Sequence, residues 1–195
     1  MIKALFFDIF GTIVDWKTSI EEQCKQSTQF KDLKIDWEKV IINWRLKYQQ
    51  SLLEINSNKK NWMDLDDVHK ENLKNVLKEM NIKNLTEFQK KILINFWHEL
   101  KPWKDSCAAI EELNQKYITC TLSNGHIKLQ KSLIKNANLN FDILFSAEHF
   151  YKYKPDKVVY QGAVNFLNLK PENCALIASH KSDLKAASEN GLKNL

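Results

Sequence analysis

Four positions with polar residues follow short apolar segments of the chain, and their residue types could do chemistry together. Asp8 directly follows the apolar run at residues 4–7. Three later segments are followed in order by further polar residues: Ser123 and Asn124, then Lys154, and then Asp183. The set offers two carboxylates, a hydroxyl with an amide, and a lysine. If the fold brings these positions together, they indicate a catalytic or binding site built around charged side chains.

The segments that would position these residues alternate between two types. Short runs of apolar, β-branched or aromatic residues predict strands at 2–7, 116–122, 141–145 and 174–178. Helical spacing predicts helices at 126–138, 156–167 and 183–190, the last ended by Gly191. Strands that alternate with helices indicate an α/β fold with a parallel sheet. Ligands of such sheets collect at the carboxyl ends of the strands, where all four polar positions lie.

Residues 16–100 do not follow this alternation. Apolar residues recur there at helical spacing, beginning with Trp37, Ile41, Trp44, Tyr48 and Leu52. Thr86 and Gln89 form the capping-box pattern of a helix start. The sequence therefore predicts a helical insertion between the first strand and the rest of the sheet. We expect this insertion to act as a lid over the end of the first strand.

Composition limits the classes of protein that the sequence fits. The chain has 195 residues, 44% of them hydrophobic, so one domain with an insertion can bury a full core. Its formal net charge is +5, and acids are scattered among the bases. This mixture argues against a nucleic-acid partner, and the positive excess mildly favours an anionic ligand. The sequence shows no signal peptide and no apolar run near the roughly 18 residues of a membrane span, so we expect a cytoplasmic protein without a membrane partner.

The residues around the polar positions resemble known motifs. Residues 8–16, 121–125 and 154–160 are similar to the first, second and third motifs of the haloacid dehalogenase superfamily, and within it of the type II 2-haloacid dehalogenases. Trp44 and Arg45 in the insertion resemble the part of that family's cap helix that bears an arginine. The similarity follows the same order along nearly the whole chain.

This resemblance implies a division of the chain. Residues 1–15 and 101–195 would form a Rossmann-like core, a parallel sheet with helices on both faces, and residues 16–100 would form an inserted helical cap. Members of the family continue beyond Gly191 into another strand and a closing helix, whereas this sequence ends at Leu195. We therefore expect the last edge strand to be missing, which would leave the site residues in place.

The resemblance also implies a reaction. Asp8 would displace a halide from the α-carbon of a short 2-halocarboxylate, and water would hydrolyse the resulting ester, which splits one difficult displacement into two steps. Arg45 and Asn124 would stabilise the departing halide, whose charge grows in the transition state. Ser123 would bind the carboxylate of the substrate.

Four further residues have supporting roles in this reaction. Lys154 would keep Asp8 ionised, because a nearby positive charge favours the carboxylate form. Asp183 would orient or deprotonate the hydrolytic water. Thr12 and Tyr160 would support Asp8 by hydrogen bonds.

The same residues fit phosphoryl transfer poorly. Phosphatases of this fold have a second aspartate two residues after the nucleophile, and this chain has Phe10 there. An anionic substrate also needs Mg²⁺ held by oxygen ligands, for which the fourth motif offers the single carboxylate Asp183. We therefore expect no metal ion and no other cofactor in the reaction. A homodimer through the helical cap is compatible with the sequence.

The fourth motif departs from the family pattern Ser-x-Asn-x-Trp-Asp. This chain has Ala178, His180 and Ser182 where the family has the serine, the asparagine and the tryptophan. His180 could change how water is activated, because histidine titrates near neutral pH, or it could be a structural hydrogen bonder. A non-catalytic protein that keeps the fold is therefore an alternative function, and a phosphatase is a third.

Each assignment also has a structural alternative. Asp8 or Asp183 could cap the helix that follows, and residues 123–125 have ordinary turn chemistry. Arg45 could be a solvated residue of the insertion, stacked on an aromatic ring. Lys154 competes with several lysines nearby in the sequence. The spatial arrangement of these side chains decides between the two sets of assignments.

Overall fold

The computed structural model describes the chain from Met1 to Leu195. A five-stranded parallel sheet has the strand order β5-β4-β1-β6-β7. Its strands are β1 Ala4–Phe7, β4 Ile118–Ser123, β5 Ile143–Ser146, β6 Cys174–Ile177 and β7 Lys193–Asn194. Two further strands, β2 Val14–Asp15 and β3 Lys101–Pro102, pair antiparallel with each other. The fold class is therefore α/β, as the alternation of segments predicted.

Helices connect the strands and cover the sheet. The α-helices are α1 Trp16–Gln26, α2 Trp37–Asn56, α3 Leu65–Glu79, α4 Glu87–Asn95, α5 Ser106–Asn114, α6 Ile127–Ala137, α7 Lys157–Phe166 and α8 Lys181–Glu189. Short 3₁₀ helices are η1 Phe96–His98, η2 Ala147–Phe150 and η3 Pro171–Asn173. The capping box predicted at the start of α4 is present: the Thr86 side chain accepts from the backbone N–H of Gln89, whose own side chain accepts from the Thr86 N–H.

The central strand β1 is buried on both faces. Leu5 and Phe7 belong to the larger hydrophobic cluster, which also contains residues of α5 and α6. Ala4 and Phe6 belong to a second cluster with residues of α7 and α8. Both faces of the strand are therefore apolar, as expected for a parallel strand between two layers of helices. The pairing of Phe7 with Thr121 of β4 and Ile177 of β6 gives the register of β1 and places Asp8 just beyond its end.

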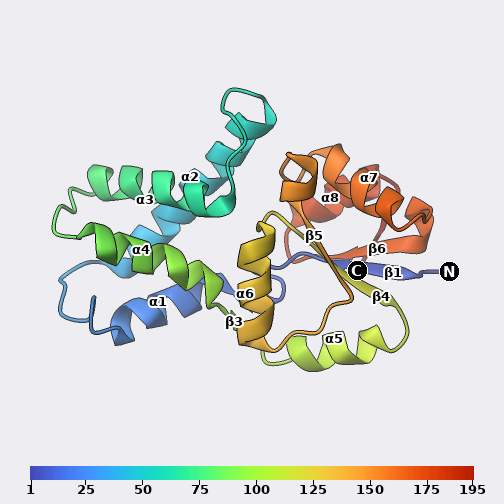
Figure 1. Ribbon diagram of the computed structural model, residues 1–195, viewed down its shortest axis with the longest axis horizontal. Coiled ribbons are helices and arrows are strands. Elements are labelled where there is room, and N and C mark those ends of the chain that lie inside the picture. The colour runs from blue at the N-terminus through green and yellow to red at the C-terminus, as the bar shows by residue number, and fades with distance from the viewer.

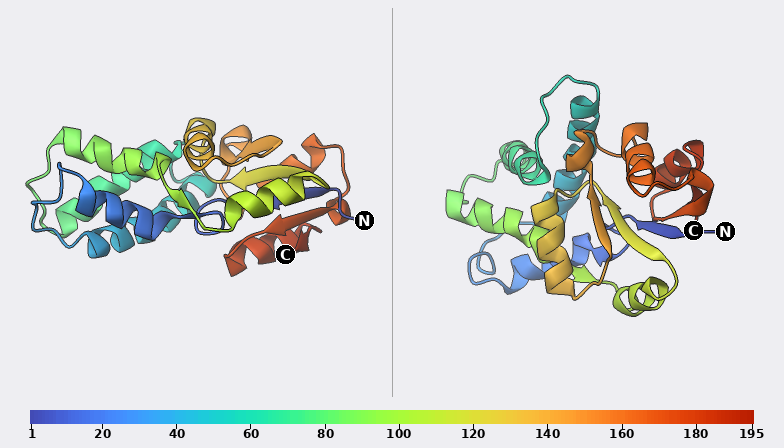
Figure 2. Two further views of the ribbon diagram at one scale, coloured as in Figure 1. Left: turned by 90° about the horizontal axis from the view of Figure 1, so that it is seen from below. Right: turned by 45° about the vertical axis from the view of Figure 1, so that its right-hand side comes forward.

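Helices α1 to α4 gather at one end of the molecule, and the parallel sheet lies at the other (Figures 1 and 2). We call these four helices the cap. The chain enters the cap through β2 and returns to the sheet through β3. These two strands pair with each other, Val14 with Pro102 and Asp15 with Lys101, and so join the two parts. The division into a core of 1–15 and 101–195 and a cap of 16–100 stays a prediction.

Several elements differ from those expected. The sequence analysis did not predict β2, β3 or α5, and of the nine residues of α5 only Ser106 and Ile110 are buried. The edge strand expected to be missing is present as a two-residue strand, because Lys193 and Asn194 of β7 pair with Ala175 and Leu176 of β6. No helix of the chain is both long enough and apolar enough to cross a membrane.

Candidate active site

Three buried charged side chains from three strand ends meet above β1. The Nζ atom of Lys154 donates to Oδ1 of Asp8 at 2.9 Å and to Oδ2 of Asp183 at 2.5 Å. Asp8, Lys154 and Asp183 are 6%, 8% and 7% exposed. One ammonium group therefore links two carboxylates that would otherwise repel each other. This arrangement rules out a surface role for Lys154 and identifies it as the lysine of the predicted site.

The electrostatics of this cluster favour its charged forms. Burial alone would raise the pKa of Asp8, but the charge of Lys154 and hydrogen bonds from His180 and Lys154 hold it well below its usual range. Burial likewise opposes the charge of Lys154, yet the carboxylates of Asp183 and Asp8 raise its pKa further. Asp8 is therefore a carboxylate and Lys154 an ammonium at neutral pH.

A tight turn after β1 supplies a second set of contacts to Asp8. Gly11 has a φ of 89°, a conformation that L-residues with a Cβ rarely adopt, and its N–H donates to the carbonyl of Val14. The turn brings Thr12 back so that its Oγ1 donates to Oδ2 of Asp8 at 2.9 Å. Thr12 therefore contacts Asp8 directly, in agreement with its predicted role as a support for that residue.

His180 reaches the same oxygen of Asp8 from the end of β6. Its Nδ1 atom lies 3.3 Å from Oδ2 of Asp8, and its side chain is 37% exposed. The loop that bears it is fixed to the turn after β1, because the N–H of Ser179 donates to Oγ1 of Thr12 at 2.9 Å. His180 is thus placed beside Asp8.

Asn124 positions the loop that bears Lys154. Its Oδ1 accepts from the backbone N–H of Lys154 at 2.8 Å, and its Nδ2 lies 3.3 Å from the hydroxyl oxygen of Tyr48 in α2. The peptide bond between Lys154 and Pro155 is cis. Asn124 therefore connects the end of β4 with both the lysine loop and the cap.

A cavity of about 250 Å³ opens directly above Asp8, between the cap and the sheet. Its lining combines charged groups of the core with polar and apolar side chains of α2: Asp8, Phe10, Arg45, Tyr48, Gln49, Leu52, Leu53, Asn56, Asn124, Lys154, Pro155, Tyr160, His180, Ser182 and Asp183. This volume suits a small organic acid rather than a large ligand.

Arg45 is the cation that the cap contributes to the cavity. Its guanidinium carbon lies 4.2 Å from the ring centroid of Tyr48 and 5.4 Å from that of Trp16. It makes neither an ion pair nor a hydrogen bond with another side chain, so aromatic faces hold it in place. A guanidinium without a carboxylate partner, lining a small cavity, favours an anionic ligand.

Two predicted residues lie differently from what was expected. The hydroxyl of Tyr160 donates to Oδ1 of Asp183 at 2.5 Å, so Tyr160 supports the second carboxylate and not Asp8. Ser123 is fully buried, and its Oγ accepts from the N–H of Gly125 at 3.0 Å. The Ser123 side chain is not part of the cavity lining. It holds the turn at the end of β4, and the next residue, Asn124, lines the cavity.

The sequence analysis missed much of the cavity wall. Tyr48 and Leu52 were predicted only as apolar positions of a cap helix, and Gln49 and Asn56 were not considered. All four lie on α2 within the spacing of one helix face from Arg45. That spacing could have identified them from the sequence, because residues on the same helix face as an arginine that lines a site are expected to line it too. Ser182, noted only as a departure from the motif, lines the cavity as well.

Comparisons with known proteins agree with this geometry. The family model described as "haloacid dehalogenase-like hydrolase" matches residues 2–191. A solved structure of the L-2-haloacid dehalogenase PA0810 superposes with a TM-score of 0.94 at 34% identity, covering 100% of this chain and 83% of that one. The structure of the defluorinating L-2-haloacid dehalogenase Rha0230 gives a TM-score of 0.93 at 35% identity, with coverage of 99% and 80%.

A curated relative is more distant in sequence. (S)-2-haloacid dehalogenase 1 of Pseudomonas sp. (strain CBS-3) is 24% identical over 207 residues, which cover 100% of this chain and 83% of the relative. The similarity of the whole chain to these proteins extends through both the cap and the sheet.

Proposed function

Because the chain belongs to the haloacid dehalogenase-like hydrolase family, we propose that it converts a short 2-haloacid into a 2-hydroxyacid. The observation that supports this most is the buried Asp8 carboxylate at the floor of a small cavity that the unpaired Arg45 also lines. Two solved relatives above 30% identity are named L-2-haloacid dehalogenases, and the proposal extends that activity to this chain. The reaction passes through an ester on Asp8.

In the first step, an oxygen of Asp8 forms a bond to the α-carbon of the substrate while the carbon–halogen bond breaks and the halide leaves with the electron pair. A charged nucleophile is needed, and Lys154 keeps Asp8 ionised. The leaving halide gains negative charge in the transition state, so Arg45 stabilises it more than the neutral carbon–halogen bond of the ground state. Asn124, which lines the same cavity, offers a second donor.

In the second step, water attacks the carbonyl carbon of the Asp8 ester. The bond to the hydroxyacid oxygen breaks, that oxygen takes up one proton of the water, and the other proton passes to a base and then to solvent. Both oxygens of Asp183 already accept hydrogen bonds, from Lys154 and Tyr160. His180, 3.3 Å from Asp8 and partly exposed, is better placed to take the proton. We therefore propose that His180 is the general base of the second step and that Asp183 holds Lys154 in position.

We propose that this chemistry needs no metal ion. The ammonium group of Lys154 contacts both carboxylates and occupies the position between them that a bridging cation would take. Phe10, at the position of the general acid of phosphatases, lines the cavity and offers no proton. Attack on a carbon that bears no phosphate also lacks the excess negative charge that a divalent ion would screen.

A halide-release assay with and without a chelator tests the proposed function. Chloroacetate and both enantiomers of 2-chloropropionate are the substrates, and an aryl phosphate with Mg²⁺ is the comparison. We expect chloride release that is unchanged by EDTA and no phosphate release. If the folded protein releases no halide from any of these acids, or releases phosphate only with Mg²⁺, the proposed function is wrong.

A further inference from the structure

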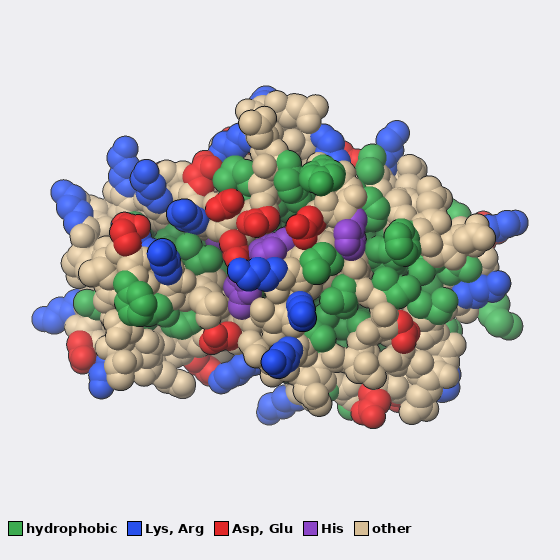
Figure 3. Space-filling view, viewed as in Figure 1, with side chains coloured by type: hydrophobic (Ala, Val, Ile, Leu, Met, Phe, Trp, Pro, Cys, Tyr) green, Lys and Arg blue, Asp and Glu red, His purple; other side chains and the backbone are tan.

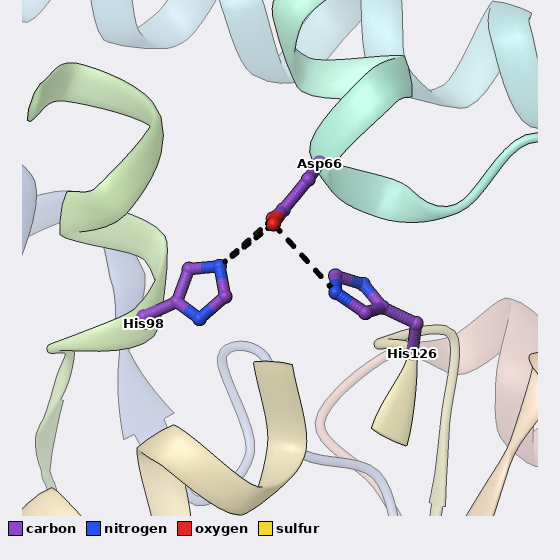
Figure 4. Close-up of side chains that lie close together, drawn as sticks. All are labelled: Asp66, His98 and His126. Carbon is purple, nitrogen blue, oxygen red and sulfur yellow. Dashed lines mark hydrogen bonds and ion pairs between the residues drawn. The ribbon is translucent and has the colours of Figure 1, made fainter. Parts of the chain in front are cut away.

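A second cluster of ionisable side chains lies outside the catalytic cavity, at the junction of the cap and the core. Asp66 is in the first turn of α3, His98 ends η1, and His126 precedes the first residue of α6. Figure 4 shows the two imidazole rings on either side of the Asp66 carboxylate, and Figure 3 shows histidine side chains near the middle of one face of the molecule. Segments far apart in the sequence therefore converge on one carboxylate.

The distances within this cluster suit a common ligand. Nε2 of His98 lies 2.9 Å from Oδ1 of Asp66, and Nε2 of His126 lies 3.6 Å from Oδ2 of the same residue. One ligand atom from each of the three residues lies within 4.8 Å of the others. Ligands that bind a metal ion at about 2.0–2.2 Å lie roughly 3–4 Å from one another, so small side-chain shifts would give them a shared centre.

We propose that Asp66, His98 and His126 form a binding site for a divalent transition-metal ion such as Zn²⁺, separate from the catalytic cavity. Two imidazole nitrogens and one carboxylate are a ligand set that favours such ions over Mg²⁺ or Ca²⁺. Three protein ligands leave the fourth position of a tetrahedral ion to water. The bound ion would join α3 of the cap to the start of α6 in the core.

His126 provides an independent observation that favours a ligand. Its side chain is 5% exposed, and its Nε2 lies beyond hydrogen-bond distance from Asp66. Its Nδ1 is buried and has no hydrogen-bond partner. A buried imidazole without a hydrogen bond is costly, and a cation at Nε2 would give the ring one polar interaction, while Nδ1 would still have no partner. His98 is already hydrogen-bonded to Asp66, so the ion would replace one direct contact there.

The exposure of Asp66 also suits a cation. The Asp66 side chain is 28% exposed, whereas those of His98 and His126 are 9% and 5% exposed. An ion can therefore reach the site from the solvent side of Asp66 and be held against the two buried rings.

The alternative is a bare histidine–aspartate ion pair that holds the cap on the core. In that case the contacts of Figure 4 are complete without a ligand, and metal ions change nothing. The two possibilities differ in whether the folded protein binds one ion per chain. They do not depend on the proposed dehalogenase reaction, because the readouts below are binding and stability.

The test uses the full chain without a histidine tag, stripped with EDTA and dialysed. Co²⁺ is titrated while visible absorption is followed, and Zn²⁺ is titrated while Tm is measured. We expect d–d absorption that saturates at one Co²⁺ per chain and a Tm that rises with Zn²⁺ concentration. Asp66→Asn and His126→Gln should each weaken Co²⁺ binding by at least the roughly 10–100-fold that loss of a metal site's outer partner costs.

Two variants control for the location of the ion. Asp67→Asn removes the neighbouring carboxylate of α3, which is exposed, and should leave Co²⁺ binding unchanged. Asp8→Asn should leave the Co²⁺ spectrum unchanged as well, because the catalytic carboxylates are not ligands of this site. The proposal is overturned if the wild-type chain shows neither absorption nor a Tm shift, or if Asp66→Asn and Asp67→Asn bind Co²⁺ equally well.

Discussion

Asp8→Asn is expected to lower halide release by on the order of 10⁶-fold, the scale seen when an enzyme loses its nucleophile. The amide has almost the shape of the carboxylate but lacks the charge that attacks carbon. Lys154 keeps its contact with Asp183 in this variant, so the cluster retains one ion pair. We therefore expect the variant to remain folded, with little change in circular dichroism, while halide release at saturating 2-chloropropionate is lost.

Asp105→Asn is the matched control for this substitution. Asp105 is exposed, and its side chain makes no capping hydrogen bond with α5. Its replacement should change neither turnover nor stability by a measurable amount. If Asp8→Asn retains more than a small fraction of wild-type activity, Asp8 is not the group that forms the ester.

Lys154→Met is expected to reduce both stability and activity. Methionine preserves much of the side-chain volume but leaves Asp8 and Asp183 buried without their shared cation. Breaking a buried ion pair by removing one partner costs about 3–5 kcal/mol, which corresponds to a fall in Tm on the order of 10 °C for a chain of this size. Without Lys154, burial also raises the pKa of Asp8, so we expect halide release to fall by on the order of 10²–10⁴-fold.

The pH dependence of this destabilisation has a definite sign. The folded-state pKa of Asp8 is lowered, so the stability gained from its pairing is present above the unfolded value of about 3.9 and is lost as the pH falls through the folded value. The pKa of Lys154 is raised, so its contribution is present below about pH 10.4 and is lost as the pH rises. Denaturant titrations should therefore show the largest difference between wild type and variant near neutral pH.

Lys157→Met provides the comparison for Lys154→Met. Lys157 is exposed and makes no ion pair, and it lies only three residues away. Its replacement should leave the free energy of unfolding within about 0.5 kcal/mol of wild type. An equal effect of both substitutions, or a Lys154→Met chain as stable and active as wild type, would contradict the role given to the buried ion-pair cluster.

The arrangement of the candidate catalytic groups could be predicted from the sequence because one rule governs all of them. Asp8, Lys154 and Asp183 each follow a predicted strand, and parallel strands present their carboxyl ends at the same edge. That rule places them at one edge of the sheet, and the structure shows Lys154 within hydrogen-bond distance of both carboxylates. The resemblance to a known family added Arg45, whose place over the cavity depends on how the cap packs on the core and cannot be read from periodicity.

Other features could not be predicted because they depend on contacts between distant segments. Tyr160 lies on α7 and Asp183 on α8, and the sequence does not show that the Tyr160 hydroxyl meets Asp183 rather than Asp8. The direction of the Ser123 side chain follows from the pleat at the last residue of β4. The cluster of Asp66, His98 and His126 comes from three segments with no shared spacing, so no sequence motif marks it.

The proposed cation site does not conflict with our proposal that catalysis needs no metal ion. Lys154 and Asp8 line the cavity, whereas none of Asp66, His98 and His126 does. An ion there would act on the fit of the cap against the core and not on the reacting atoms. Chelation should therefore lower Tm without removing the chemistry, provided that the assay temperature lies well below the unfolding transition.

The central claim is that an oxygen of Asp8 becomes bonded to the substrate, and isotope labelling tests it most directly. A single turnover is run in H₂¹⁸O with the protein in excess over 2-chloropropionate, and the product and the peptide containing Asp8 are analysed by mass spectrometry. We expect the hydroxyacid to contain ordinary oxygen taken from Asp8, and the Asp8 carboxylate to gain one ¹⁸O. Heavy oxygen in the product of the first turnover, with no label on Asp8, would show that water attacks the substrate directly and would contradict the account.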